Sequence, residues 1–537
     1  MFEGTARRSF ELDADPPTML PSYNRFVPYL ATLLFAATRL AATEPSHSDT
    51  HSSITSARLQ EHVEVLADDS FEGREAGTRG GRAAAGYLVQ CLQKWGLAPA
   101  GENASYFQNF DHGFRNVLAE IRADAAPHES GTIVVCGHYD HVGLGNRSNS
   151  YGPIGLIHNG ADDNASGVAG LLELARYLAK LRSSLKKSVL FIFWDGEERG
   201  LLGSRYWLEH PTVALNQVDL VINVDMIGRL RKKRLEVLGT RTAFHLRQFV
   251  TRQNRISQLE IDFIWKLTAN SDHYPFIEHG IPAMMFHTGL HEDYHRPSDE
   301  THLLNIAGLE QVTRLLRRIV WRACQHESGF QYRDAWREET DSSRQALESE
   351  SLAPPPRLGV QWDAGDTSFG LRLISVTRDL PASRAGLQSQ DLIVALNGRQ
   401  ITDSAHFQHS ILTHAVPIVL SVQRPAEPEV YEMTIKLTGK PQPFGITWRE
   451  DPAEPGIAIV TRVATGSRAA AAGLRVADRL YEISGNQWHS DRQLSHWLNH
   501  LPTPLPLLVE RNGCLEVVVL KDKPTPPVFF APQHNLK

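Results

Sequence analysis

The 537-residue chain is poor in cysteine and has no strong excess of either charge. Its cysteines, at positions 91, 136, 324 and 514, form no CxxC pair, which argues against a cysteine-based zinc site and favours scattered free thiols. The formal net charge is −6 and the pI is about 6.5, so the basic face of a nucleic-acid-binding protein is missing. We therefore expect no nucleic-acid partner. The most obvious basic cluster, RKKR at 231–234, is typical of a solvated turn.

Apolar runs long enough to cross a membrane are also missing. Residues 26–42 form a short apolar stretch followed by small residues, which is typical of a secretory signal peptide cleaved near Ala42. Its uninterrupted part is shorter than the ~20 residues of a spanning helix, so an uncleaved leader would be the one route to a membrane. Residues 1–18 are acidic for a leader, which makes Met19 a candidate start. We expect a secreted, periplasmic or cell-envelope protein of bacterial type, with a leader at 1–42 and a linker at 43–55.

Residues 56–327 alternate apolar runs with helical patterns. The apolar runs TIVVCG, SVLFIFW, VDLVINVD and IPAMMF predict buried strands at 132–137, 188–194, 218–225 and 281–286. Helical patterns lie between them, and a long helix follows. Near-continuous apolar strands separated by helices are typical of a mostly parallel sheet covered on both faces. We expect a three-layer α/β/α domain with a central mixed, mostly parallel sheet.

The C-terminal third contains an internal repeat. Gly386, Asp391 and Gly398 recur as Gly473, Asp478 and Gly485, at an offset of 87 residues. Strand-like alternation dominates each copy, so we expect two small, mainly β domains. A charged, Ser-rich segment ending in prolines precedes them and is typical of a linker. The predicted boundaries are 328–356 for this linker, 357–439 and 440–523 for the repeats, and 524–537 for a tail.

Each predicted strand is followed by residues of types that commonly bind metals. The first leads to "HYDH", the second to "DGEE", the third to Asp225 and the fourth to "HTGLHEDYH". Ligands of open α/β sheets bind beyond the carboxyl ends of the strands, so these side chains should meet in one crevice. A further pair, Asp162 and Asp163, stands just before a predicted helix, where either could instead serve as a helix cap. Histidine and carboxylate ligands suit zinc and leave it Lewis-acidic.

Six motifs in order give these stretches a family resemblance. "GHYDH", "NGADDNASG", "WDGEERGLLGS", "NVDMIGR", "SDHYPF" and "DYHRPSD" resemble those of the dizinc aminopeptidases of clan MH, which also includes glutamate carboxypeptidases and glutaminyl cyclases. The resemblance covers roughly residues 55–325. It implies a zinc exopeptidase fold, two zinc ions and peptide substrates.

Carried over motif by motif, the resemblance also implies residue roles. His138 and Asp225 would bind one zinc ion, and Glu198 and His295 the other. Asp163 would bridge both ions. Glu197 would act as general base, and Asp140 would orient His138. Two neighbouring dications explain why two adjacent glutamates are tolerated, because the ions offset their repulsion. A metal-bridging hydroxide would attack the scissile carbonyl while Glu197 moves the proton.

Three alternatives remain open at this point. A carboxypeptidase or other amidohydrolase on the same scaffold would need a basic residue for the substrate carboxylate, and Arg229, Arg241 and Arg296 are available. A glutaminyl cyclase fits less well, because that branch uses one zinc ion. A peptide-binding protein with an inactive peptidase domain is the third. Asp272 is expected to support the site, and His141 and His158 to be structural or exposed.

The two repeats resemble PDZ domains of bacterial secreted or envelope proteases. The shared pattern is "AGL…D…I…G", with "LGV" (358–360) and "FGI" (444–446) where the peptide-carboxylate loop would be. Such domains add a peptide strand to a sheet edge. Peptide C-termini are therefore candidate ligands, and a packing or spacing role is the alternative.

Overall fold

The computed structural model describes residues 53–521, apart from 124–130, 353–355, 364–369 and positions 402, 415–416, 426, 440, 443 and 466. The predicted leader and the C-terminal tail lie outside the described residues. No helix in the described part is long and apolar enough to cross a membrane.

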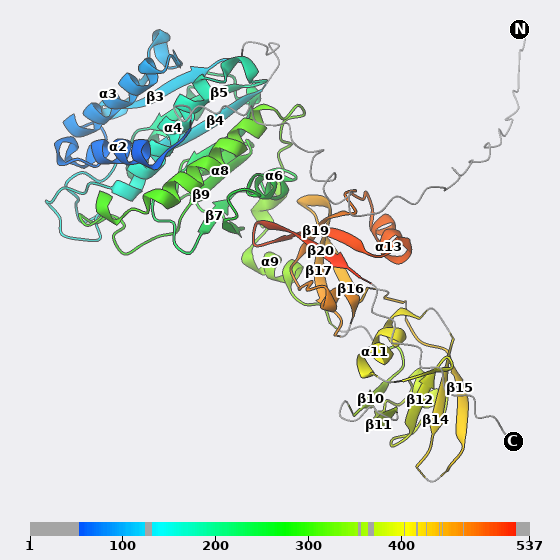
Figure 1. Ribbon diagram of the computed structural model, residues 1–537. Coiled ribbons are helices and arrows are strands. Elements are labelled where there is room, and N and C mark those ends of the chain that lie inside the picture. The colour runs from blue at the N-terminus through cyan, green and yellow to red at the C-terminus, as the bar shows by residue number, and fades with distance from the viewer. Residues whose placement is uncertain are drawn as a thin grey trace, which may run out of the picture. The chain divides into compact units, whose positions relative to one another are not determined.

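The first part of the chain is built on one nine-stranded mixed sheet (Figure 1). Its strand order is β1 (Ala98–Pro99), β3 (Phe114–Ile121), β5 (Ser188–Trp194), β4 (Thr132–His138), β6 (Val218–Val224), β9 (Ala283–His287), β7 (Arg234–Leu238) and β8 (Glu260–Ile264), with β2 (Phe107–Phe110) paired to β3. The four central strands are parallel, and antiparallel pairs flank them. The four strands predicted from apolar runs are these central ones, and the prediction of a mixed sheet is confirmed.

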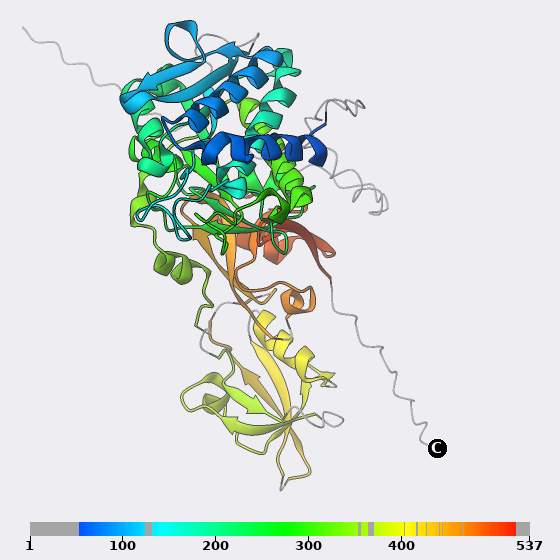
Figure 2. The same cartoon turned by 90° about the vertical axis from the view of Figure 1, so that its left-hand side faces the viewer.

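Helices cover both faces of this sheet. One face packs against α2 (Ser56–Leu66), α3 (Arg79–Lys94), α4 (Gly167–Ala179), α6 (Leu246–Gln253) and α8 (Ile306–Cys324). The other face packs against α5 (Leu202–Glu209) and α7 (His273–Glu278). Figure 2, turned by 90°, shows the blue helix α2 on the outside of the first face. The expected three layers follow because the central strands are apolar on both faces.

Local sequence explains where the main helices begin and end. Thr78 caps α3 by accepting from the N–H of Gly81, and Gly96 follows the helix with φ +73°, a conformation that favours glycine. Asn305 caps α8 by accepting from the N–H of Gly308. The RKKR cluster forms an exposed turn at Lys232 and Lys233, as predicted, before β7 begins.

The C-terminal third forms two β-rich units of the same design. The first contains β10 (Val360–Trp362), β11 (Leu371–Val376), α10 (Pro381–Arg384), β12 (Leu392–Leu396), β13 (Arg399–Gln400), α11 (Ser404–Thr413), β14 (Ile418–Gln423) and β15 (Val430–Ile435). The second contains β16 (Ile446–Asp451), β17 (Glu454–Val463), α12 (Arg468–Ala471), β18 (Arg479–Ile483), α13 (Asp491–His500), β19 (Leu505–Arg511) and β20 (Cys514–Leu520). Each unit has its own apolar core, so the repeat seen in the sequence is a repeat of folded domains. In the sequence, helix α9 (Asp341–Glu348) lies between the nine-stranded sheet and these units.

Candidate metal centre

The central strands bring distant polar residues to one edge of the sheet. His138 is the last residue of β4, Glu197 and Glu198 lie in the turn after β5, and Asp225 follows β6. His295 lies in the segment after β9. Since β5, β4, β6 and β9 are neighbouring parallel strands, their carboxyl ends meet at one place. The side chains that the sequence places at these strand ends therefore lie close together.

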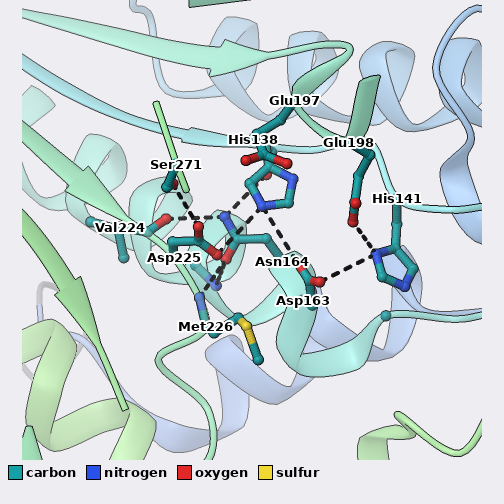
Figure 3. Close-up of polar contacts among 12 residues, drawn as sticks. His138, His141, Asp163, Asn164, Glu197, Glu198, Val224, Asp225, Met226 and Ser271 are labelled. Atoms are coloured by element: carbon teal, nitrogen blue, oxygen red, sulfur yellow. Dashed lines mark hydrogen bonds and ion pairs between the residues drawn. The ribbon is translucent and has the colours of Figure 1, made fainter. Parts of the chain in front are cut away.

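Asp163 lies at the middle of this cluster, in the turn before α4 (Figure 3). Its Oδ1 is 3.3 Å from Nε2 of His138, whereas its Oδ2 is 3.1 Å from Nε2 of His295. The two oxygens of one buried carboxylate thus face two different histidines. This is the arrangement that a carboxylate shared by two cations requires.

The first group around Asp163 contains His138 and Asp225. Their candidate ligand atoms all lie within 4.8 Å of one another. Nε2 of His138 is 3.4 Å from Oδ1 of Asp225, and the hydroxyl of Ser271 donates to Oδ2 of Asp225 at 2.6 Å. The serine therefore fixes the carboxylate while leaving Oδ1 turned toward the histidine (Figure 3).

The second group contains Glu198, His295 and an unexpected member, His141. Nε2 of His295 is 3.2 Å from Oε2 of Glu198, and Nδ1 of His141 is 2.9 Å from Oε1 of the same carboxylate. His141 is buried, so it is not the exposed residue allowed for by the sequence. It contacts both Glu198 and Asp163, so it either contributes a ligand or holds Glu198 in place.

Glu197 belongs to a third group with His138 and Glu198. Burial raises the pKa of Glu197 well above its ordinary value, and the neighbouring carboxylate of Glu198 adds to the rise while His138 opposes it. Burial lowers the pKa of His138, but the carboxylates of Glu197 and Asp225 outweigh it, so the pKa of His138 is raised overall. These groups of histidines and carboxylates could hold metal ions.

Asp140 lies beside His138, as the sequence predicts. Its main-chain oxygen and its carboxylate have different partners. Nδ1 of His138 is 3.1 Å from the main-chain oxygen of Asp140 and 3.8 Å from its carboxylate. The carboxylate instead accepts from the main-chain N–H of Glu197 at 3.2 Å and of Glu198 at 3.4 Å. Asp140 therefore fixes both the histidine and the turn that carries the two glutamates.

Further buried side chains hold the loops of the centre. The amide of Asn164 donates to the carbonyls of His138 and Val224, and its oxygen accepts from the N–H of Met226 (Figure 3). Arg74 is buried and donates to five main-chain carbonyls, those of Leu66, Tyr139, Asn159, Gly160 and Asp163. None of these supports was identified from the sequence, because main-chain partners leave no pattern in it.

Asp272, which the sequence predicts to support the site, and His291 lie near the centre. Asp272 is buried, and burial raises its pKa to about 7. His291 has its Nε2 3.2 Å from Oδ2 of Asp162, in the loop that leads to His295. Neither belongs to the three candidate metal groups of the described residues. The four cysteines are free thiols, as expected.

Two parts of the chain are similar to known protein families. Residues 116–320 match the sequence model of peptidase family M28, and residues 356–437 match that of the PDZ domain. Aminopeptidase YwaD of Bacillus subtilis is 32% identical over 205 residues, which are 36% of this chain and 42% of that protein. Leucine aminopeptidase 1 of Leptosphaeria maculans is 25% identical over 287 residues, which are 49% of this chain and 69% of that protein.

Among solved structures, the LapA aminopeptidase of Legionella pneumophila has a TM-score of 0.42 and 21% identity, covering 50% of this chain and 71% of that one. The chain spans less than half the length of the first curated relatives that it matches, 42% for YwaD and 33% for a probable leucine aminopeptidase 2 of Aspergillus oryzae. Residues 116–320 are thus similar to peptidase family M28 and residues 356–437 to the PDZ domain, and we call the part built on the nine-stranded sheet the peptidase domain.

Proposed function

We propose that this protein is a zinc-dependent exopeptidase, an aminopeptidase that removes N-terminal residues from peptides. The proposal rests on the position of the Asp163 carboxylate. Its Oδ1 faces His138 and its Oδ2 faces His295. The family match and the aminopeptidase names of the relatives support the same reaction.

We assign two zinc ions to the centre. His138 and Asp225 would hold one ion, Glu198 and His295 the other, and Asp163 both. The donor set fits, because it contains only imidazole nitrogens and carboxylate oxygens gathered within 4.8 Å in each group. When bound, zinc polarises the scissile carbonyl and lowers the pKa of water.

The reaction then depends on what Glu197 does. Its carboxylate lies beside His138 and Glu198 without belonging to either of the two groups that share Asp163. A carboxylate oxygen of Glu197 takes a proton from the attacking water and passes it to the nitrogen of the leaving amine. Asp140 keeps Glu197 in reach by accepting from its main-chain N–H.

The structure favours an aminopeptidase over a carboxypeptidase. A carboxypeptidase needs an available cation for the terminal carboxylate of its substrate. Arg229 is already bonded to Asp293 and Asp299, and Arg241 to Glu339 and Asp451. Of the three arginines considered from the sequence, only the exposed Arg296 keeps that role open.

A substrate panel with and without chelator tests the proposed reaction. We expect hydrolysis of aminoacyl substrates, no hydrolysis of the same substrates with an acylated amine, and loss of activity with chelator that zinc restores. Metal analysis should give two zinc ions per chain. Cleavage of C-terminal residues, or turnover that survives metal removal, would overturn the proposal.

Glu197→Gln tests the assigned base. We expect kcat to fall by about 10²–10⁴-fold, with the zinc content kept, since the amide cannot accept the proton. Glu292→Gln is the matched control, because Glu292 is an exposed carboxylate in the loop that carries His295. Unchanged turnover in Glu197→Gln would contradict the role given to this residue.

We also propose that peptide C-termini bind the PDZ-like repeats. The second repeat has an open groove of about 330 Å³ between β16 and α13, lined by residues that include Phe444, Ile446, Trp448 and Leu498. The groove would take an extended peptide as an added strand beside β16. Fluorescence titration with peptides that differ only in a free or amidated C-terminus would measure this binding.

The location of the protein is proposed from its leader alone. Residues 26–42 have the composition of a signal peptide, so we propose export to the periplasm, cell envelope or medium. N-terminal sequencing of protein recovered from each fraction tests this, and a mature chain that still begins at Met1 or Met19 would contradict cleavage near Ala42.

A further inference from the structure

Buried charges join the second repeat to the peptidase domain, and the described residues of both belong to one compact unit. The guanidinium of Arg247, in α6, donates to both carboxylate oxygens of Glu510, in β19, each at 3.1 Å. Arg241 donates to both oxygens of Asp451 at 3.0 and 3.1 Å. Glu510 and Asp451 are buried, at 0% and 1% exposed, so solvent does not screen these pairs.

The main chain takes part in the same contact. The N–H groups of Arg247 and Gln248 donate to the carboxylate of Glu454 at 3.1 and 3.2 Å. They stand in the first turn of α6, where helix N–H groups have no partner within the helix. A carboxylate from the second repeat therefore completes a helix of the peptidase domain.

The contact also covers an edge of the peptidase sheet. β8 is the last strand of that sheet, and its Ile261 N–H donates to the carbonyl of Asn512 at 2.8 Å. The amide of Asn254 donates to the carbonyl of Gly513 at 2.8 Å. Asn512 and Gly513 form the turn between β19 and β20. An open strand edge is a site for unwanted pairing, and here the turn of the second repeat occupies part of it.

The first repeat lacks the residues that make this contact. In the second repeat, Arg479 of β18 is paired across the sheet with Glu510 of β19. The pair at the equivalent place in the first repeat, 87 positions earlier, is Leu392 and Gln423. Arg479 bonds Asp451 at 2.7 Å and is fully buried.

The two repeats also differ at the position of Glu482, whereas they share the ion pair formed by Asp478 and Arg511. Glu482 bonds Arg252 of the peptidase domain at 2.9 Å, and the first repeat has Ala395 there. In contrast, the pair Asp478 and Arg511, internal to the second repeat, recurs as Asp391 and Arg424 in the first. The copies therefore keep a charge pair that serves the repeat itself and differ at the charges that meet the peptidase domain.

We infer that the second repeat is an internal docking domain for the peptidase domain: its acidic face, formed by Asp451, Glu454, Glu482 and Glu510, binds the basic face formed by Arg241, Arg247 and Arg252. The groove between β16 and α13 is lined by a different set of residues, so docking leaves it open. This inference does not depend on the proposed peptidase activity, because its readouts are structural.

Hydrogen exchange on the full chain tests the docking. Glu510→Gln and Arg479→Leu each introduce the residue of the first repeat. We expect the amides of Arg247, Gln248 and Ile261 to exchange at least about tenfold faster in both, because removing one partner leaves a buried charge uncompensated. Glu516→Gln is the matched control, since this carboxylate is half exposed and pairs with Arg511 inside the repeat.

A variant on the other side of the contact guards against simple unfolding of the repeat. Arg247→Met leaves the repeat unaltered and should speed exchange at Ile261 while amides between β19 and β20 stay protected. The double variant Arg247→Met with Glu510→Gln should lose less protection than the sum of the two single losses. Strictly additive effects, or unchanged exchange at Ile261 in Arg247→Met, would overturn the docking role.

Discussion

At the scale of single residues, the centre depends on how each carboxylate is shared. Burial raises the pKa of Asp163, but the surrounding histidines more than offset this, so its pKa is lowered well below the ordinary value. Asp163 therefore stays ionised in a buried place. Glu197 has the opposite balance, with its pKa raised chiefly by burial. These two buried carboxylates thus have pKa values shifted in opposite directions.

His141 gives the first prediction at this scale. Its Nδ1 is 2.9 Å from Glu198 and 3.7 Å from Asp163. We expect His141→Ala to weaken zinc binding by about 10–100-fold, the effect of losing a residue that binds or orients a ligand. Competition with a fluorescent chelator measures the affinity, and His279→Ala, an exposed histidine, is the control. Equal affinities for the two variants would exclude His141 from the centre.

Glu173 gives a second prediction, on stability against pH. Burial raises the pKa of this α4 carboxyl, but the nearby His62 and hydrogen bonds from Arg176 and Arg58 outweigh it and lower the pKa from 4.5 to about 2. An acid whose pKa is lower in the folded state stabilises the fold above pH 4.5, by about 3 kcal/mol for this shift, and loses that contribution as pH falls toward 2.

Denaturant unfolding of Glu173→Gln and of the parent chain at several pH values tests this. We expect the parent to be more stable at pH 7 and the difference to shrink between pH 4.5 and 2. The exposed Glu64→Gln, on α2, should track the parent throughout. A difference that does not change with pH would mean that the ionised form of Glu173 contributes nothing.

At the scale of elements, close contact between β4 and β6 positions the ends that carry His138 and Asp225. A Cβ added to Gly137 would lie 2.5 Å from the carbonyl oxygen of Val224, the last residue of β6. Gly137→Ala should therefore push the two strands apart, lower the free energy of unfolding by about 1–3 kcal/mol and reduce zinc affinity.

Gly86→Ala is the control for this change. Gly86 is in α3, and nothing lies within 4 Å of the added Cβ. Because alanine favours helix over glycine, this variant should be stabilised by about 0.5–1 kcal/mol and bind zinc as before. Thermal unfolding with and without zinc separates the two glycines, and equal behaviour would refute the close contact.

The elements that the sequence predicts are those with the longest apolar runs. The central strands β4, β5, β6 and β9 are buried on both faces, so nearly every residue in them is apolar and the signal is strong. The flanking strands β2 and β7 have exposed positions and few residues, and no comparable run marks them. The ends of the central strands were therefore predictable, and with them most of the candidate ligands.

His141 escaped prediction for a related reason. The strand ends at His138, and the alternation that assigns side chains to faces ends with it. Three residues later, the direction of a side chain depends on the turn, which Arg74 fixes through the carbonyl of Tyr139. The bonds from Arg74 to main-chain carbonyls are also long-range contacts that leave no local sequence pattern. The same holds for the ion pairs between the second repeat and α6.

At the scale of the whole molecule, apolar cores and charged contacts have separate roles. The peptidase domain, the first repeat and the second repeat each have their own buried apolar cluster. Buried ion pairs join the peptidase domain to the second repeat, as do hydrogen bonds to the edge of β8. Each part can thus keep its fold while the contact between two of them is tuned by single charges.

Metal removal gives the prediction at this scale. The candidate ligands lie at the ends of central strands, in the segment after β9 and in the turn before α4, so ions bound there would tie together most of the peptidase sheet. A ligand that binds only the folded state stabilises it by about 4 kcal/mol at a thousandfold excess over its Kd. We therefore expect chelator to lower the Tm of the peptidase domain by several degrees and added zinc to restore it. The two repeats have cores of their own, so a separate transition of the first repeat should not move. Calorimetry of the parent chain and of Glu198→Gln measures this, and the variant should respond less to chelator because it holds one ion poorly. If neither chelator nor zinc changes the Tm, the folded cluster binds no metal, whatever its geometry.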